Sequence, residues 1–309
     1  MSEAQAERFR ERPQSEQTGL RFPTMTWHIA DQNVLITGGS SGIGMAVART
    51  LAAGGASVTI TSRDVARAER AVRTIEGLTG VRVAADIVDL SKLDSVHEFA
   101  DRYVALHDRI GVLVNNAGNV FGSRRETVEG NEMTFGTNHL GPFLLTSLLS
   151  GSLGGDHASR VINTSSVAHT HAKEGILFDD LGWKKRRYKM MDVYGHSKLA
   201  NILHARGIND RTGTEVQAYA VHPGVVGTSF GGRGGSVVVR AATKFGKRWM
   251  RTPQEGADTI IWLATEPNID TTKGIYFSDR KVEKSTRFAR DPDQADRLWQ
   301  VSERLVGLT

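Results

Sequence analysis

Short apolar runs alternate with longer amphipathic segments along most of the chain. Runs of three to six mostly apolar residues, many of them β-branched, predict buried strands, and they lie at 34–36, 58–60, 81–83, 110–114, 161–163, 216–221 and 274–277. Apolar residues that recur every three or four positions predict helices between these runs, at 43–51, 64–76, 96–106 and 193–207. Strand and helix in regular alternation predict an α/β fold, with a doubly wound parallel sheet between two layers of helices.

The two ends of the chain differ in character. Residues 1–26 are polar and charged and follow neither a helical nor a strand period, which predicts a mobile tail. Near the other end, the spacing of Trp299, Val301 and Leu305 predicts a C-terminal helix that packs on the rest of the protein. No linker divides the sequence in between, so we expect residues 27–309 to form a single domain.

Composition excludes several classes of protein. The 309-residue chain has no Cys, which excludes disulfide frameworks, thiolate metal sites and a Cys nucleophile. Its 39 Lys and Arg are nearly balanced by 34 Asp and Glu, so no nucleic-acid partner is expected. No apolar run is long enough for a membrane span, and the N-terminus lacks the apolar core of a secretory signal. We therefore expect a cytoplasmic protein.

A glycine-rich loop lies between the first expected strand and the first expected helix. It reads Thr37-Gly38-Gly39-Ser40-Ser41-Gly42-Ile43-Gly44. Glycines allow the backbone to approach a pyrophosphate closely, and the start of the following helix offers N–H groups and partial positive charge to that anion. The loop predicts a dinucleotide site, and the alternative is a glycine-rich turn without a ligand.

Tyr194 and Lys198 are four residues apart on an expected helix, so both project from one face. A phenol has an ordinary pKa of about 10, and a neighbouring ammonium favours the phenolate and lowers that pKa. Such a pair is a tunable acid or base for an alcohol–ketone pair. The alternative, for this pair taken alone, is a surface pair on an amphipathic helix.

The loop and five further blocks, in this order, resemble the short-chain dehydrogenase/reductase family. The blocks are Asn115-Asn116-Ala117-Gly118, Asn138-His139-Leu140-Gly141-Pro142-Phe143, Ser165-Ser166, Tyr194-Gly195-His196-Ser197-Lys198, and His222-Pro223-Gly224-Val225-Val226-Gly227-Thr228. The resemblance covers about residues 30–280 and implies a Rossmann-type fold. The strings at 197–201 and 298–303 resemble the retinol-dehydrogenase-like branch.

The resemblance implies a catalytic group. Tyr194 would act as the acid or base, and Ser166 would hydrogen-bond the carbonyl oxygen. Lys198 would bind the ribose hydroxyls of the nicotinamide nucleotide, and Asn138 would hold a water in a relay to Lys198. Ser166 aligns better than Ser165, which we expect to point into the sheet because neighbouring strand residues face opposite sides.

The end of the second expected strand favours NADP (NADPH) over NAD. An acidic residue there would bind the ribose 2′-hydroxyl, but this chain has Thr61-Ser62 followed by Arg63. A guanidinium suits the 2′-phosphate. The resemblance adds Asp89 near the adenine, Asn116 and Val226 along the cofactor, and Thr228 at the carboxamide. The expected cofactor-binding residues are Gly38, Ser40, Ser41, Gly42, Ile43, Gly44, Arg63, Asp89, Asn116, Tyr194, Lys198, Val226 and Thr228.

Two segments are expected to border the substrate. Ser166 and Tyr194 are further apart than in most of the family, which indicates an insertion at 170–192 with Trp183, Tyr188 and a basic run at 184–189. In the family, the segment after the Pro-Gly motif acts as a lid, here 229–251. Its glycines supply flexible backbone, and the apolar residues expected on its underside are Val237, Val238, Val239, Phe245, Trp249 and Met250. Together these segments predict a bulky, largely apolar substrate, with Trp183 and Trp249 among its anchors.

The most specific expectation is therefore an NADP-dependent oxidoreductase that reduces a ketone or aldehyde. The alternatives are a C=C reductase of the same fold, or a regulator that senses NADP without chemistry. The family commonly pairs through the helices that carry Asn138 and Tyr194, so a homodimer is expected. His169 and His171 have no acidic or Cys partner at useful spacing, so no metal is expected.

Overall fold

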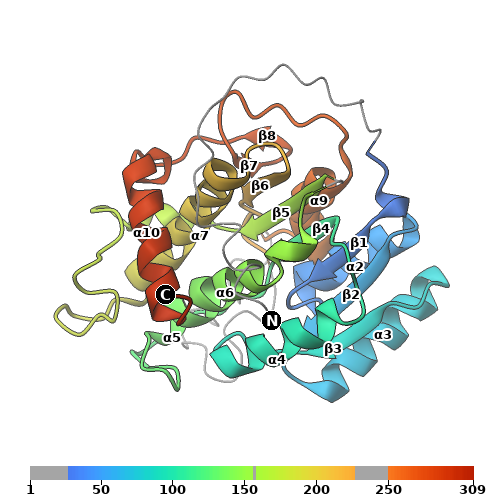
Figure 1. Ribbon diagram of the computed structural model, residues 1–309, viewed down its shortest axis with the longest axis horizontal. Coiled ribbons are helices and arrows are strands. Elements are labelled where there is room, and N and C mark those ends of the chain that lie inside the picture. Colours follow the sequence, from blue (N-terminus) through green and yellow to red (C-terminus); the bar gives the residue numbers. More distant parts are fainter. Residues whose placement is uncertain (1–26, 156–157, 227–249) are drawn as a thin grey trace.

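One sheet runs through the protein, and a computed structural model describes it over residues 27–155, 158–226 and 250–309 (Figure 1). Within these residues the sheet has eight strands in the order β3-β2-β1-β4-β5-β6-β7-β8. Every pair is parallel except β7 with β8. The strands are β1 (Asn33–Ile36), β2 (Ser57–Ser62), β3 (Ala84–Ile87), β4 (Val112–Asn115), β5 (Ser159–Thr164), β6 (Val216–Val221), β7 (Tyr276–Ser278) and β8 (Lys281–Val282). The strand order reverses between β1 and β4, and open α/β sheets bind ligands beside such a point.

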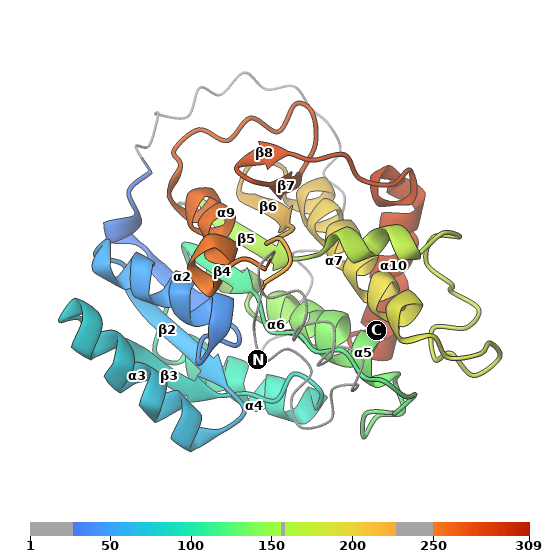
Figure 2. The same ribbon diagram turned by 180° about the vertical axis from the view of Figure 1, so that it is seen from behind.

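Helices cover both faces of the sheet (Figures 1 and 2). The longer ones are α2 (Gly42–Ala53), α3 (Val65–Thr79), α4 (Leu93–Val104), α6 (Gly141–Leu148), α7 (Met190–Thr212), α9 (Pro253–Thr265) and α10 (Pro292–Leu305). The short helical segments are η1 (Ile29–Asp31), α5 (Met133–Phe135), η2 (Gly136–Leu140), η3 (Ser150–Ser152), η4 (Val167–His171) and η7 (Phe288–Arg290). Helices α2, α3 and α9 pack on one face, and α4, α6 and α7 pack on the other. The predicted three-layer Rossmann-type fold in one domain is confirmed.

Burial explains why the strand prediction succeeded in the middle of the sheet and failed at its edge. The residues of β4 and β5 are buried at every position, because helices cover both faces of a parallel sheet. The prediction at 81–83 is wrong, since β3 is Ala84–Ile87. β3 is an edge strand and partly exposed, so its sequence lacks a continuous apolar run. The helix expected to reach residue 106 ends at Val104, and Leu106 is 80% exposed.

The C-terminal helix α10 packs across α7 and α6 (Figure 1). The Trp299 ring lies 4.9 Å from the ring of Phe143 on α6, and the Arg211 guanidinium from α7 lies 4.2 Å from the Trp299 ring. On α7, a Cβ at Gly207 would approach Trp299 to 2.7 Å, so glycine permits this close packing. Every residue of α6 and most residues of α7 are buried. The expected tail at 1–26, and the expected lid apart from Met250 and Arg251, lie outside the described residues.

Candidate active site

The glycine-rich loop bends sharply between β1 and α2. Gly38 and Gly42 have φ angles of 68° and 55°, a region that side chains disfavour. A Cβ at Gly44 would lie 2.6 Å from the carbonyl oxygen of Gly38 and from Asn116 Nδ2. Ser41 precedes α2 in an extended conformation and makes no side-chain capping bond, and the first turn of α2 has no acidic residue. The N–H groups at this helix start therefore suit an anion such as the pyrophosphate of a dinucleotide.

Buried Thr37 joins this loop to the loop after β4. Its hydroxyl oxygen accepts the N–H groups of Asn116 at 3.0 Å and Ala117 at 3.1 Å. The side-chain amide of Asn116 donates back to the Thr37 carbonyl at 2.9 Å. Asn116 is thereby held against the glycine-rich loop, as its expected place along the cofactor requires. Sequence reasoning gave Thr37 no role, and its position directly after a buried strand was the available signal.

Ser62, the last residue of β2, organises the turn expected to select the cofactor. Its hydroxyl oxygen accepts the Asp64 N–H and the Ser40 hydroxyl, both at 3.2 Å. Arg63 follows Ser62, is exposed, and makes no side-chain hydrogen bond or ion pair with another described residue. Beyond β3, the Asp89 carboxylate accepts the N–H and hydroxyl of Ser91 at 3.1 and 2.6 Å. The loops after β1, β2 and β3 thus place Ser40, Arg63 and Asp89 together at the carboxyl ends of the parallel strands.

The structure brings Ser166, Tyr194 and Lys198 together at the carboxyl end of β5. The Ser166 side chain reaches the Tyr194 phenol closely enough to oppose the rise in its pKa. Lys198 Nζ lies 5.4 Å from the centre of the Tyr194 ring and donates to the Thr164 carbonyl at 2.9 Å. Ser165 instead donates its hydroxyl to the Lys198 carbonyl at 2.7 Å, so the two serines have different partners.

Close packing of η4 on α7 sets the distance between Ser166 and Tyr194. A Cβ at Gly195 would lie 2.5 Å from the Ala168 carbonyl oxygen and 2.8 Å from His171 Cβ. Only glycine lets these two segments approach so closely. Gly195 is therefore a structural requirement of the Ser166–Tyr194 contact, although sequence reasoning treated it only as part of a motif.

Burial dominates the protonation behaviour of this group. It lowers the pKa of Lys198 to about 8, because removal from water disfavours the ammonium. It also raises the pKa of Tyr194, and the Ser166 hydrogen bond opposes this effect. The expected lowering of the Tyr194 pKa is therefore wrong for this structure, since loss of hydration outweighs stabilisation of the phenolate.

Asn138 lies in η2, a π-helical turn, and its side chain is fully engaged. Its Oδ1 accepts the Asn119 N–H at 2.7 Å, and its Nδ2 donates to the Asn119 carbonyl at 2.9 Å and to Ser197 Oγ at 3.0 Å. Pro142, four residues later, has no N–H, so the Asn138 carbonyl lacks the donor that an α-helix would supply. The Asn138 side chain is occupied by protein partners, and its expected part in a water relay stays a prediction. Sequence reasoning missed Asn119 and Ser197, which depend on contacts between distant segments.

Val226 reaches the start of α2 from the other side of the site. It forms an isolated parallel bridge with Arg251. A Cβ at Gly256 on α9 would lie 2.5 Å from Val226 Cγ2 and 3.3 Å from Ile43 Cγ1. Val226 and Ile43 therefore pack on the same spot of α9, as two residues along one cofactor would. The remaining expected contact, Thr228, lies outside the described residues.

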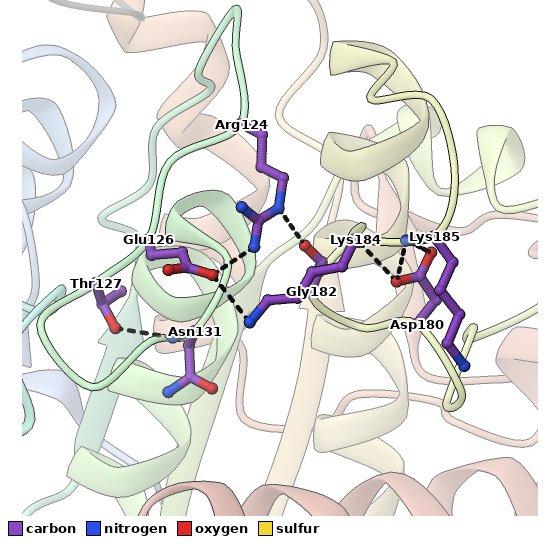
Figure 3. A network of polar contacts seen from close by, with 8 residues as sticks. All are labelled: Arg124, Glu126, Thr127, Asn131, Asp180, Gly182, Lys184 and Lys185. Atoms are coloured by element: carbon purple, nitrogen blue, oxygen red, sulfur yellow. Dashed lines mark hydrogen bonds and ion pairs between the residues drawn. The ribbon is translucent and has the colours of Figure 1, made fainter.

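The inserted segment between η4 and α7 is fastened by polar contacts (Figure 3). The Asp180 carboxylate accepts the N–H groups of Lys184, Lys185 and Arg186 at 2.7 to 3.2 Å. These backbone bonds keep the pKa of Asp180 below its usual range despite desolvation. From the loop that follows β4, Arg124 donates to the Gly182 carbonyl of the inserted segment at 2.7 Å.

One expectation for the insertion needs correction. Trp183 is buried against Leu177, Val193 and Tyr188, so it does not face an opening. The basic run is partly neutralised, because Lys184 pairs with Glu126 at 3.1 Å and Arg186 with Glu174 at 3.3 Å. Trp183 is buried because the segment folds on itself and on a loop some sixty residues earlier in the sequence.

Known proteins resemble this chain along most of its length. A family model described as short chain dehydrogenase matches residues 32–177. Retinol dehydrogenase 12 of Mus musculus is 39% identical over 287 residues, covering 92% of this chain and 89% of the relative. Retinol dehydrogenase 13 of Homo sapiens is 38% identical, with 91% and 86% covered. Short-chain dehydrogenase TIC 32 A, chloroplastic, of Brassica napus is 37% identical, with 88% of each chain covered.

Solved structures agree with these relatives. An uncharacterized protein from Mycobacterium Paratuberculosis superposes with a TM-score of 0.69 at 32% identity, covering 92% of this chain and 98% of that chain. A short chain dehydrogenase from Burkholderia cenocepacia J2315 in complex with NADP gives a TM-score of 0.60 at 25% identity, with 77% and 91% covered. Among the described residues, no helix is long and apolar enough to cross a membrane. The chain is thus an oxidoreductase of the short-chain dehydrogenase/reductase family and belongs to its retinol-dehydrogenase-like branch.

Proposed function

We propose that this protein is an NADP-dependent oxidoreductase that reduces a ketone or aldehyde on a bulky, largely apolar substrate. One observation carries the proposal. The Tyr194 phenol lies beside the Ser166 side chain and the buried Lys198 ammonium, at the carboxyl end of the sheet where the glycine-rich loop also lies. This arrangement supplies a proton donor, an oxygen-binding hydroxyl and a cation around one point.

The proposed mechanism assigns each side chain a part in moving one proton. The Ser166 hydroxyl binds the substrate oxygen and orients it toward Tyr194. The Tyr194 hydroxyl donates its proton to that oxygen, and NADPH held at the site would supply the hydride. Lys198 has a pKa of about 8, so it can exchange protons with Tyr194 close to neutral pH. Asn138 would hold the water through which Lys198 regains its proton.

The described residues suit NADP as the cofactor. The start of α2 suits its pyrophosphate, and exposed Arg63 at the end of β2 suits its 2′-phosphate. Asp89 and Asn116 would flank the adenosine half. Lys198 Nζ uses one hydrogen for the Thr164 carbonyl, which leaves two for ribose hydroxyls. The NADP complex of the Burkholderia relative supports this assignment.

Turnover tests the proposed function directly. We expect the protein to oxidise NADPH in the presence of all-trans-retinal and to release the corresponding alcohol, because the proposed group protonates a carbonyl oxygen. A product with a reduced C=C bond would favour the alternative reductase, and cofactor binding without turnover would favour the sensing regulator. A cytoplasmic location stays a prediction, since one relative is named as chloroplastic.

Exposed apolar side chains border the candidate site. Val167 is 52% exposed and follows Ser166, Met191 is 40% exposed and precedes Tyr194 by one helical turn, and Val225 is 60% exposed and precedes Val226. We call Val167, Met191 and Val225 the apolar rim. Each comes from a different segment of the site, and each would gain by covering an apolar molecule. The apolar rim supports an apolar substrate more directly than Trp183 does.

Replacing Val167 and Val225 together by Ser should raise KM for all-trans-retinal about 5- to 30-fold. The change removes apolar contacts worth roughly 0.8 kcal/mol for each methyl-sized group. KM for a two-carbon aldehyde should stay unchanged, because that substrate is too small to cover the apolar rim. Leu78→Ser is the matched control, since Leu78 is 63% exposed at the C-terminal end of α3, away from the site. Equal KM values for both variants would exclude the apolar rim from substrate binding.

The packing of α10 argues against the expected four-helix dimer. Helix α10 covers α6 and α7, the helices through which the expected dimer would form. Every residue of α6 is buried, so α6 offers no exposed surface to a second subunit. Light scattering at micromolar concentration should therefore report a monomer. A dimer at that concentration would require either another surface or displacement of α10.

A further inference from the structure

His169 makes three contacts that tie the Ser166 turn in place. Its backbone N–H donates to the Ser166 carbonyl at 3.0 Å, and its ring Nδ1 lies 2.8 Å from the same oxygen. Its ring Nε2 lies 3.3 Å from the backbone nitrogen of Thr286, between β8 and η7. The side chain is buried, and no step proposed above uses it.

Both ring partners are backbone groups, so the tautomer is determined. A carbonyl oxygen can only accept a hydrogen bond, so Nδ1 must carry the ring proton. A backbone N–H can only donate, so Nε2 must be unprotonated. An imidazolium would set Nε2–H against the Thr286 N–H. The structure therefore requires a neutral His169 with its proton on Nδ1.

The surroundings of His169 favour that neutral form. Its ring meets the Tyr276 ring edge-on at 4.9 Å. Burial lowers its pKa, while the Ser166 hydrogen bond opposes this effect. Burial raises the pKa of Tyr276, and the negative charges of Glu283 and an ionised Tyr194 add to this effect. His222 is also close enough to His169 for the two charges to repel each other. Among the described residues, no carboxylate forms an ion pair with the His169 ring that would hold it protonated.

Ser166 needs such support because its own element is weak. It precedes η4, a five-residue 3-10 helix, and such helices have poor hydrogen-bond geometry. The Ser166 hydroxyl must meet both the Ala168 N–H, at 3.1 Å, and the Tyr194 phenol. Small rotations of this turn would lose the second contact first.

We propose that His169 is a positioning residue, whose neutral ring joins the Ser166 carbonyl to the Thr286 backbone and thereby aims the Ser166 hydroxyl at Tyr194. The consequence for turnover rests on the proposed function, whereas the tautomer does not. His169 would act through Ser166 and would touch neither substrate nor cofactor.

Two substitutions test the two ring hydrogen bonds of His169 one at a time. The side-chain amide of His169→Asn can place its nitrogen near the Nδ1 position and keep the bond to Ser166. The longer amide of His169→Gln can reach the Nε2 position and keep the bond to Thr286. His169→Ala loses both, and His171→Ala is the control, since His171 is an exposed neighbour on η4.

We expect kcat to fall about 10- to 100-fold in His169→Ala and His169→Gln, as a misplaced catalytic group would cause. His169→Asn and His171→Ala should stay within about threefold of the unmodified protein, with KM for NADPH unchanged in all four. If kcat follows melting temperature across the variants, regardless of which bond is kept, His169 is merely structural. Unchanged kcat in His169→Ala would also overturn the proposal.

A second measurement does not depend on turnover. Nitrogen-15 NMR of the ring in the unmodified protein should show protonated Nδ1 and unprotonated Nε2 at pH 7. Absence of turnover together with this signature would refute the proposed function and leave the tautomer standing. A His169 ring protonated on Nε2 would refute the proposed link between Ser166 and Thr286, even in an active enzyme.

Discussion

Tyr194→Phe should lower kcat with all-trans-retinal by about 10²- to 10⁴-fold, the usual contribution of a positioned acid or base. The change removes the hydroxyl that we propose donates the proton, together with its contact to the Ser166 side chain. The ring keeps its place near Lys198 Nζ. The dissociation constant for NADPH and the melting temperature should therefore stay close to those of the unmodified protein. Steady-state kinetics, fluorescence titration and calorimetry measure these quantities separately.

Tyr219→Phe is the matched control for this loss. Tyr219 lies on β6, is buried, and bonds through its hydroxyl to Gln217 at 2.8 Å. It packs on the opposite face of the sheet from α7, so removing its hydroxyl should leave kcat unchanged. A near-normal kcat in Tyr194→Phe would show that another group donates the proton.

Arg63→Ala should weaken NADPH binding about 10- to 150-fold and leave NADH binding nearly unchanged. A hydrogen bond to a charged group contributes roughly 1.5–3 kcal/mol, and each 1.4 kcal/mol is about tenfold in affinity. Arg63 has no partner among the described residues that would compete for a phosphate. Titration with both cofactors measures the difference.

Two further variants define the cause of that selectivity. Arg70→Ala removes the same charge from the exposed side of α3, and it should change neither affinity. Ser62→Asp should weaken NADPH by repelling its 2′-phosphate, because Ser62 ends β2 beside Arg63. Equal efficiency of NADH and NADPH in the unmodified protein would contradict the role of Arg63.

The sequence predicted those parts of the molecule that depend on one element at a time. The run at 216–221 coincides with β6 because every residue of this strand except exposed Gln217 is apolar and buried. The spacing of Tyr194 and Lys198 places both on one face of α7, and the structure has them 5.4 Å apart from ring centre to Nζ. Each of these conclusions needs only the local period of the chain.

Contacts between distant segments could not be predicted in the same way. The engagement of the Asn138 side chain depends on Asn119 and Ser197, and nothing near Asn138 in the sequence indicates either. Trp183 looks like a ligand anchor in the sequence, yet it packs against residues of its own segment. The raised pKa of Tyr194 likewise follows from surrounding atoms rather than from its lysine neighbour.

The burial of α7 bears on how this protein can change. Its faces pack against β5, β6, η4 and α10, so its backbone amides can open only when most of the fold opens. Tyr194 and Lys198, the two groups proposed to move the proton, therefore lie on a helix that we expect to resist local unfolding. The inserted segment is held by backbone hydrogen bonds to Asp180 and by buried Trp183, whereas its exposed ion pairs, such as Lys184 with Glu126, contribute little to stability. Mutation of these exposed charges can therefore alter the surface of that segment, which we expect to border the substrate, while the proton-handling helix and the global stability stay intact.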